Sequence, residues 1–399
     1  MSKPAPQGEE GLIGLPRSYA SIVWGQLRKR PSAMISLGGV ALLAVLAVIA
    51  PFIAGEVPIR WVEGGRVSWP LFHYLENAEY SAMLALVLAV TLPLTLRFVR
   101  PRAEAVGASP WFRAVVLHAG VWLAVTLTLY AVREPEGRYG FFLERRAEAE
   151  SAWFPPIAWS HNPGYEELAF RDQPPSWQHP LGTARLGDDV LLRILYGART
   201  AMTIGFVAVG IGSSIGVILG ALSGYFARKM DLVLMRIAEI FMFIPTLILI
   251  IIILAVIPAS VPPLWAVVVV IGVTGWTGAY RLMRAELFRI RNEDYMTAAR
   301  ALGVPTWRLL VRHAVPNGLA PILVGAGFGI AGAIGIELTL AFLGLVQTPS
   351  WGEMLNDGRQ HLEYWWVWAS AGAIIFVTMF AYNLLAEAIR DAIDPKLRV

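Results

Sequence analysis

Long uninterrupted runs of apolar residues dominate the chain. Eight of them are long enough to cross a bilayer, whose hydrocarbon layer of roughly 30 Å takes about 20 residues of α-helix. The predicted spans are residues 33–54, 81–99, 114–132, 201–225, 235–257, 264–282, 319–345 and 366–387. The pattern predicts an all-α polytopic membrane protein with about eight transmembrane helices.

Lysine and arginine are distributed unevenly among the segments between these spans. If the N-terminus lies inside, the inner segments hold 22 of the 33 basic residues and the short outer loops hold 3. The other 8 lie in the long segment 133–200, where loop length weakens the positive-inside rule. The counts predict that both termini are cytoplasmic, that residues 133–200 are external and that residues 284–318 are internal.

Composition supports this class of protein and argues against an enzyme. Hydrophobic residues make up 56% of the 399 residues and charged residues only 16%, whereas a soluble domain has about 25% charged residues. The absence of cysteine excludes disulfides and thiolate metal sites. The sequence also lacks a phosphate-binding loop, a zinc-binding helix and a serine elbow. We expect no enzymatic activity and no ATPase site, cofactor, metal or nucleic-acid partner for this chain.

Three segments outside the main group of spans have a distinct character. Residues 1–32 form a cytoplasmic N-terminus, in which an interfacial amphipathic helix is predicted around Tyr19–Leu27. Residues 81–132 are expected to form an extra transmembrane hairpin. Residues 133–200 are rich in aromatic residues and proline, and either a small folded cap or a partner-binding segment fits them. The core transmembrane domain is expected over residues 201–390.

Two acidic residues fall within predicted spans, where a buried charge is costly and suggests function. Glu239 follows Arg236 by three residues, so an ion pair within one helix is the alternative to a functional role. Glu337 lies deeper, and it faces either a water-filled path or a neighbouring helix. Glycines recur every four residues from Gly212 to Gly224, a pattern compatible with self-association or with packing inside the chain.

Two short amphipathic helices are predicted within the internal loop 284–318. Asn292 is the expected cap of the first, whose small and apolar stripe is Tyr295, Ala298, Ala299 and Leu302. Gly303 is expected to end this helix with a positive φ. Pro305 should begin the second helix and Pro316 should end it, with a stripe of Trp307, Leu310, Val311 and Ala314. Such a pair fits a groove on a cytoplasmic partner or a position on the membrane surface.

This loop resembles the coupling loop of ATP-binding-cassette (ABC) importer permeases. The family pattern is Glu-Ala-Ala, three residues, Gly, and a Pro thirteen residues later. Ala298, Ala299, Gly303 and Pro316 match it, and Thr297 replaces the Glu. The segments around Gly197-Ala198-Arg199, Pro349-Ser350-Trp351-Gly352 and Asp394-Pro395 resemble the second-permease type of the dipeptide/oligopeptide (peptide/nickel) branch. Residues 64–71 are similar to a segment of microcin-C-type peptide importer permeases.

The resemblance implies a type I ABC importer permease in a bacterial inner membrane, with six standard helices plus the extra hairpin. It implies as partners a second permease, two cytoplasmic ATP-binding subunits and an extracytoplasmic solute-binding protein, with a peptide as the solute. Nickel or an oligosaccharide remains an alternative solute for the same class. An autonomous ion-coupled transporter that uses Glu239 and Glu337 is the alternative function from a different class.

Overall fold

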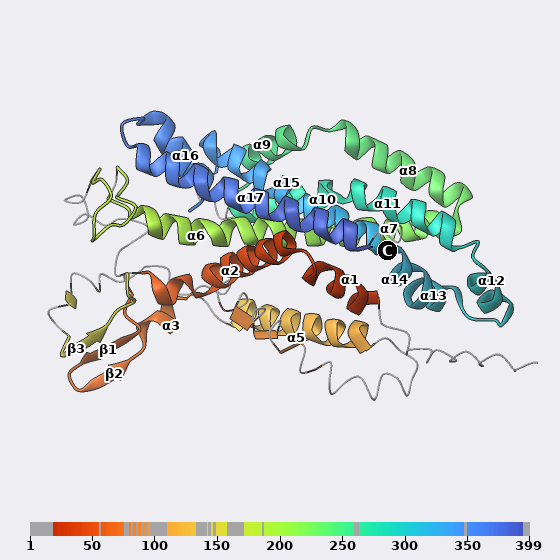
Figure 1. Ribbon diagram of the computed structural model, residues 1–399, viewed down its shortest axis with the longest axis horizontal. Helices are drawn as coiled ribbons and strands as arrows, with labels where there is room; N and C mark the ends of the chain where they lie inside the picture. The colour runs from red at the N-terminus through yellow and green to blue at the C-terminus, as the bar shows by residue number, and fades with distance from the viewer. Residues whose placement is uncertain are drawn as a thin grey trace, which may run out of the picture.

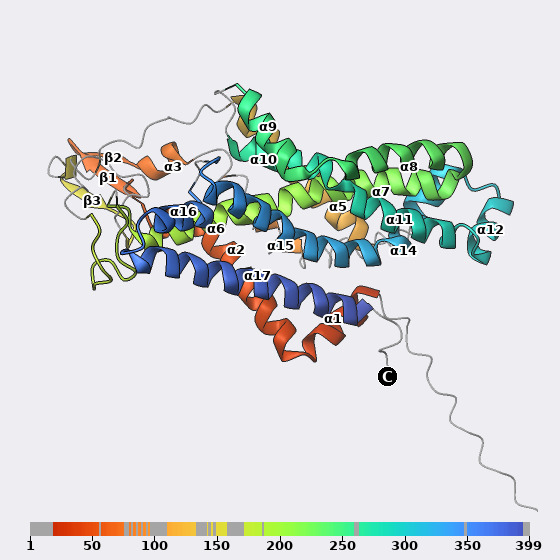
Figure 2. The ribbon, with the colours of Figure 1, turned by 90° about the horizontal axis from the view of Figure 1, so that it is seen from above.

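The computed structural model describes residues 19–55, 57–75, 110–132, 149–157, 171–185, 187–258, 263–346 and 349–393, with single positions between 80 and 95 and between 142 and 146. Most of these residues are helical, and the longest helices run along one common axis (Figures 1 and 2). The prediction of a mainly helical, multi-pass membrane protein is confirmed.

Five helical segments of the described residues are long and apolar enough to cross a membrane. They are α2 (Pro31–Ile53), the continuous segment Val190–Phe226, the segment Pro263–Ile290, α15 (Ala320–Phe342) and α17 (Trp365–Ile393). The second comprises α6 (Val190–Thr203), a π-helical stretch (Ile204–Ala208) and α7 (Val209–Phe226). The third comprises α10 (Pro263–Thr274) and α11 (Trp276–Ile290).

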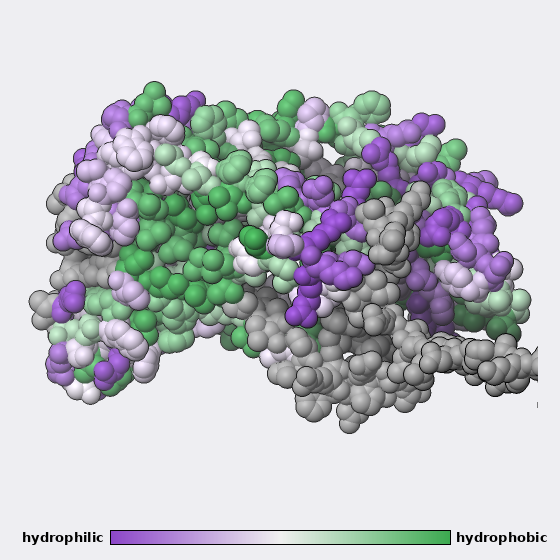
Figure 3. Space-filling view, viewed as in Figure 1, coloured by the Kyte–Doolittle hydropathy of each residue, from purple (hydrophilic) through white to green (hydrophobic). Residues whose placement is uncertain are grey.

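Apolar side chains gather around the middle of these helices, and hydrophilic residues lie toward both ends (Figure 3). Helix α12 (Asp294–Ala301) lies at one end of the molecule, and α16 (Trp351–Gln360) and a small sheet lie at the other (Figures 1 and 2). Following the predicted topology, we call the end with α12 the inner end and the end with α16 the outer end.

Two predicted boundaries in this body were wrong. The helix expected from residue 201 begins at Val190, where Asp189 accepts a hydrogen bond from the backbone N–H of Leu192 at 3.0 Å. The span expected over 235–257 is two helices, α8 (Arg228–Phe243) and α9 (Thr246–Val256), with a 76° bend between them. Pro245 lies at the bend, and its ring and missing N–H account for the break.

The glycine repeat of α7 packs against α11 of the same chain. A Cβ atom added to Gly216 would lie 2.5 Å from the carbonyl oxygen of Trp276, and one added to Gly220 would lie 2.6 Å from that of Tyr280. Real Cβ atoms do not approach so closely, so only glycine permits this backbone contact. Of the two interpretations of the repeat, packing inside the chain is the one observed.

A three-stranded antiparallel sheet, which the sequence patterns did not predict, lies at the outer end (Figure 1). Its central strand β1 (Arg60–Glu63) pairs with β2 (Arg66–Ser68) and with β3 (Ser151–Trp153). The short helix α3 (Pro70–Tyr74) follows β2. Part of segment 133–200 therefore belongs to a small folded unit that also uses residues before the predicted hairpin.

The predicted N-terminal helix is α1 (Tyr19–Arg28), and it packs on the inner end of α17 through Leu27. Arg30 forms an ion pair with Asp391 at the same place. The second half of the predicted hairpin is α5 (Pro110–Val132), which lies apart from the main bundle in Figure 1. The predicted span 81–99 lies largely outside the described residues.

Candidate functional site

The internal loop forms two helical segments at the inner end of α11. After α12 the chain turns at Gly303 and continues through α13 (Thr306–Leu309), a π-helical stretch (Leu310–Ala314) and α14 (Val315–Gly318). The last three follow one another without a break, so the second predicted helix is longer than expected. Both segments lie at the inner end (Figure 2).

Gly303 forms the turn between the two segments with a φ of +74°. Its N–H donates to the carbonyl of Arg300 at 3.0 Å, and the N–H of Val304 donates to the carbonyl of Ala299 at 3.1 Å. These two bonds form a Schellman motif, whose C′ residue is usually glycine. The side chains of Val304 and Ala299 both pack on one hydrophobic cluster, which is the apolar contact expected with this motif. The predicted helix end at Gly303 is confirmed.

Three local predictions in the loop were wrong. The N-cap of α12 is Glu293 rather than Asn292, because the Asn292 amide donates instead to the carbonyl of Phe288. Pro305 precedes α13 as its N-cap. Pro316 does not end the second helix. In the preceding π-helical stretch the backbone hydrogen bonds join residues five apart, and the N–H of Val315 donates to the carbonyl of Leu310. This wider turn lets the helix continue past Pro316, which has no N–H to donate.

The face of the loop directed away from the bundle carries most of the predicted stripe. Leu302 is 83% exposed, Trp307 is 63% exposed and Tyr295 is 42% exposed. Thr297 and Ala298 are also exposed. Large apolar side chains that a soluble surface would bury are thus left uncovered at the inner end. An exposed apolar patch of this kind favours a protein partner.

The opposite face attaches the loop to the bundle. Met296, Leu309 and Leu310 are buried together with Met283 and Leu287 of α11. Ala299 is half-buried and packs on the same cluster. Three members of the predicted stripes, Ala299, Leu310 and Ala314, therefore face the bundle rather than a partner.

A partly buried polar network, which the sequence patterns did not predict, connects α11 with α7 and α8. Arg284 makes a bidentate ion pair with Asp231, with 2.7 Å between Nη2 and Oδ2. The Ser223 hydroxyl donates to the same carboxylate and lies 3.0 Å from the Tyr280 hydroxyl. The sequence feature that could have indicated this network is Asp231, an acidic residue beside an apolar run, because a carboxylate there requires a positively charged partner.

The two intramembrane acidic candidates have different surroundings. Glu239 accepts a hydrogen bond from Arg236 at 2.6 Å on an exposed face of α8, so the ion pair within one helix is present. Glu337 is 1% exposed in α15, and the Ser350 side chain lies near its carboxyl group. Its Oε1 atom has no hydrogen-bond partner among the described residues. The structure does not bring the two acids together into one site.

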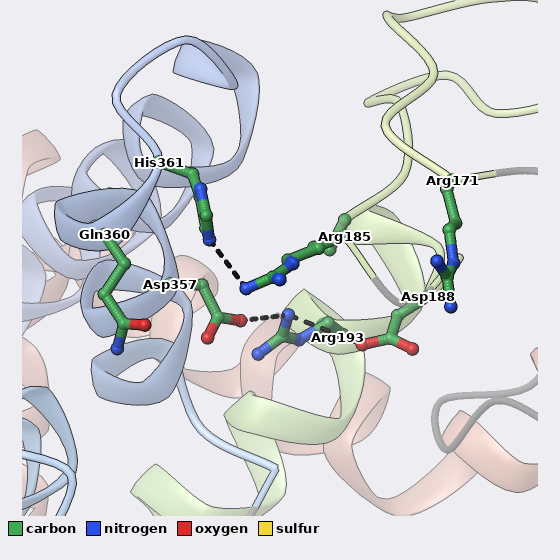
Figure 4. A pocket seen from close by; sticks show the side chains of 8 residues that line it. Arg171, Arg185, Asp188, Arg193, Asp357, Gln360 and His361 are labelled. Atoms are coloured by element: carbon green, nitrogen blue, oxygen red, sulfur yellow. Dashed lines mark hydrogen bonds and ion pairs between the residues drawn. The ribbon is translucent and has the colours of Figure 1, made fainter. Parts of the chain in front are cut away.

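A second charged network lies at the outer end, where α6 meets α16 (Figure 4). The buried Arg193 donates to Asp357 at 2.6 Å and lies 3.5 Å from Asp188 and 3.7 Å from Glu353. Burial outweighs the attraction of Arg193 and raises the pKa of Asp188 to about 6. An arginine within a helix that leads into an apolar run was the available signal, but no local pattern indicated its distant partner Asp357.

Two known protein families match parts of this chain. The family described as binding-protein-dependent transport system inner membrane component matches residues 216–399. The family described as N-terminal TM domain of oligopeptide transport permease C matches residues 18–60. These stretches contain the loop 284–318, Glu337 and α16, and helices α1 and α2.

Relatives and a solved structure also match. The oligopeptide transport system permease protein OppC of Bacillus subtilis (strain 168) is 37% identical over 252 residues, which cover 62% of this chain and 81% of the relative. The dipeptide transport system permease protein DppC of the same organism is 36% identical over 248 residues, which cover 61% and 77%. An inward-facing MetNI methionine ABC transporter chain aligns with 51% of this chain and 98% of its own length, at 17% identity and a TM-score of 0.44. By its family match and its identity to these relatives, the chain belongs to the binding-protein-dependent inner membrane permeases of ABC transporters.

Proposed function

We propose that the chain is the permease subunit of an ATP-driven importer for di- or oligopeptides or peptide-like solutes. It forms half of the translocation pathway, together with a second permease. Two cytoplasmic ATP-binding subunits attach at the inner end, and an extracytoplasmic solute-binding protein delivers the solute at the outer end. The names of the relatives support a peptide as the solute, and the uncovered face of the loop supports the attachment.

The loop is built to pass movement of an attached ATPase into the bundle. Its inner face packs on α11 through buried apolar side chains. Arg284 of α11 is bonded to Asp231 of α8, and the glycines of α7 place its backbone against α11. A displacement of α12 therefore moves α7, α8 and α11 together, because close-packed interfaces transmit strain rather than absorb it.

Co-purification of the ATPase subunits with a Leu302→Glu variant tests the attachment. Leu302 is almost fully exposed and contacts no core cluster, so the variant should insert and fold normally. A carboxylate placed in a desolvated apolar groove should weaken attachment at least tenfold, since unpaired buried charge is costly. Leu362→Glu is the matched control, because Leu362 is 70% exposed at the outer end. Equal ATPase recovery with both variants would contradict the proposed attachment.

The solute class requires a separate experiment. The whole importer, reconstituted in proteoliposomes with its solute-binding protein, should take up labelled di- or oligopeptides when ATP is present. Uptake of nickel or an oligosaccharide without peptide uptake would overturn the peptide assignment and keep the importer class. Uptake by the permease chain alone, driven by an ion gradient, would instead favour the autonomous transporter.

A further inference from the structure

A cavity of about 260 Å³ opens at the outer end between the loop before α6 and the end of α16 (Figure 4). Seven of its eight lining residues are polar or charged, namely Arg171, Arg185, Asp188, Arg193, Asp357, Gln360 and His361, and the eighth is Ala184. Three guanidinium groups against two carboxylates leave the lining with an excess of positive charge, which suits an anionic group.

Two exposed arginines lie at the rim of this cavity, whose lining also carries the carboxylates of Asp188 and Asp357. Arg171 and Arg185 are exposed, and neither forms an ion pair with a described carboxylate. Nη1 of Arg185 lies 3.0 Å from Nε2 of His361, and Nδ1 of the same ring lies 3.5 Å from Oε1 of Glu363. The remaining guanidinium N–H groups of Arg185 are available to a carboxylate, which they can bind in a bidentate manner.

The floor of the cavity is occupied by charges that already have partners. Arg193 is held by Asp357 and Asp188, so it adds little attraction for another anion. One oxygen of Asp188, Oδ1, is buried without a hydrogen-bond partner among the described residues and would repel an incoming carboxylate. Because burial raises the pKa of Asp188 to about 6, uptake of one proton removes this repulsion at modest cost.

The two helices that flank the cavity, α6 and α16, pack directly on each other. Nε1 of Trp351 donates to the carbonyl of Ile194 at 3.0 Å. A Cβ atom added to Gly197 would lie 2.5 Å from the ring of Trp351. This contact fixes the position of α16 on α6 and therefore the position of the residues that line the cavity.

We propose that this cavity receives an acidic side chain of the extracytoplasmic solute-binding protein when that protein docks. The inference rests on the proposed function and specifies one contact within it. The positive charges of Arg171 and Arg185 complement the negative charge of such a side chain. Trp177, which lies between these two arginines in the sequence, is fully exposed. Arginine and tryptophan are the residues most enriched among those that dominate binding energy at interfaces.

Affinity measurements on the assembled importer in nanodiscs test this contact. Arg185→Glu and Arg171→Glu should each weaken docking of the solute-binding protein at least tenfold and make it less sensitive to salt, because a charge attraction is replaced by a repulsion. Arg359→Glu is the control, since Arg359 is exposed on α16 but does not line the cavity. It should change the affinity less than twofold. A reversed charge at the partner's acidic residue should restore docking to Arg185→Glu.

Three results would overturn the inference. Unchanged docking by both cavity variants would show that the cavity is not a docking contact. Unchanged docking combined with reduced transport of free-acid peptides, but not of C-terminally amidated ones, would assign the cavity to the solute's own carboxylate. No docking by the unmodified importer would instead remove the proposed function itself, which separates that failure from the first two.

Discussion

Replacement of Gly303 by valine should misalign the two helical segments of the inner loop. Gly303 has a φ of +74°, a region in which a β-branched residue is strained by about 1–3 kcal/mol. A Cβ atom at this position meets no other atom within 4 Å, so the cost is conformational and involves no steric clash with neighbours. A penalty of about 1.4 kcal/mol changes an equilibrium tenfold. The native arrangement of the loop should therefore lose roughly a factor of 5 to 150 in relative population.

The loss should appear in attachment of the ATPases rather than in membrane insertion. The apolar clusters of the bundle do not include Gly303, so the variant chain should be recovered from membranes in normal amounts. The two Schellman hydrogen bonds fix the position of Val304 and hence the direction of α13. ATPase co-purification and transport by reconstituted vesicles should both fall for Gly303→Val.

A graded series separates backbone strain from side-chain size. Asparagine tolerates the left-handed region better than other non-glycine residues, so Gly303→Asn should lie closest to the unmodified protein. Gly303→Ala should be intermediate and Gly303→Val lowest. Equal attachment by all three variants, or normal attachment by Gly303→Val alone, would refute the assignment of this turn to ATPase attachment.

Three further perturbations address the rest of the molecule. Arg193→Ala should lower the free energy of unfolding by about 3 kcal/mol in a denaturant titration, because the neighbouring carboxylates lose their buried partner, whereas Arg359→Ala should change it little. The pKa of Asp188 is raised to about 6 by burial, so the folded state gains stability as the pH falls from above 6 toward 4, by up to about 3 kcal/mol. Asp188→Asn should flatten that gain in thermal unfolding curves. Deletion of residues 81–132 should leave solute-stimulated ATP hydrolysis intact in the assembled complex, and loss of stimulation would contradict a peripheral role for the hairpin.

The sequence predicted those features that depend on local pattern. Apolar runs located α2, α15 and α17 within a few residues, because hydrophobic length alone decides a membrane helix. Gly303 was identified as a helix end because the turn that ends a helix needs a residue with a positive φ, which glycine adopts without strain. The start of α6 was missed, since Arg193 and its neighbours interrupt the apolar run and their partners lie more than 150 residues away in α16.

The two ion pairs between distant residues, which the sequence did not predict, also fix the relative positions of helices at the two ends of the bundle. Arg193 lies at the outer end of one long helix and Arg284 at the inner end of another, and each is bonded to an aspartate of a neighbouring helix. An unpaired charge at such a position is costly in a membrane, and a paired one is tolerated. Each pair therefore selects one register of α16 on α6 and of α8 on α11. Apolar packing alone discriminates weakly between registers in lipid, because every register buries similar hydrocarbon against hydrocarbon.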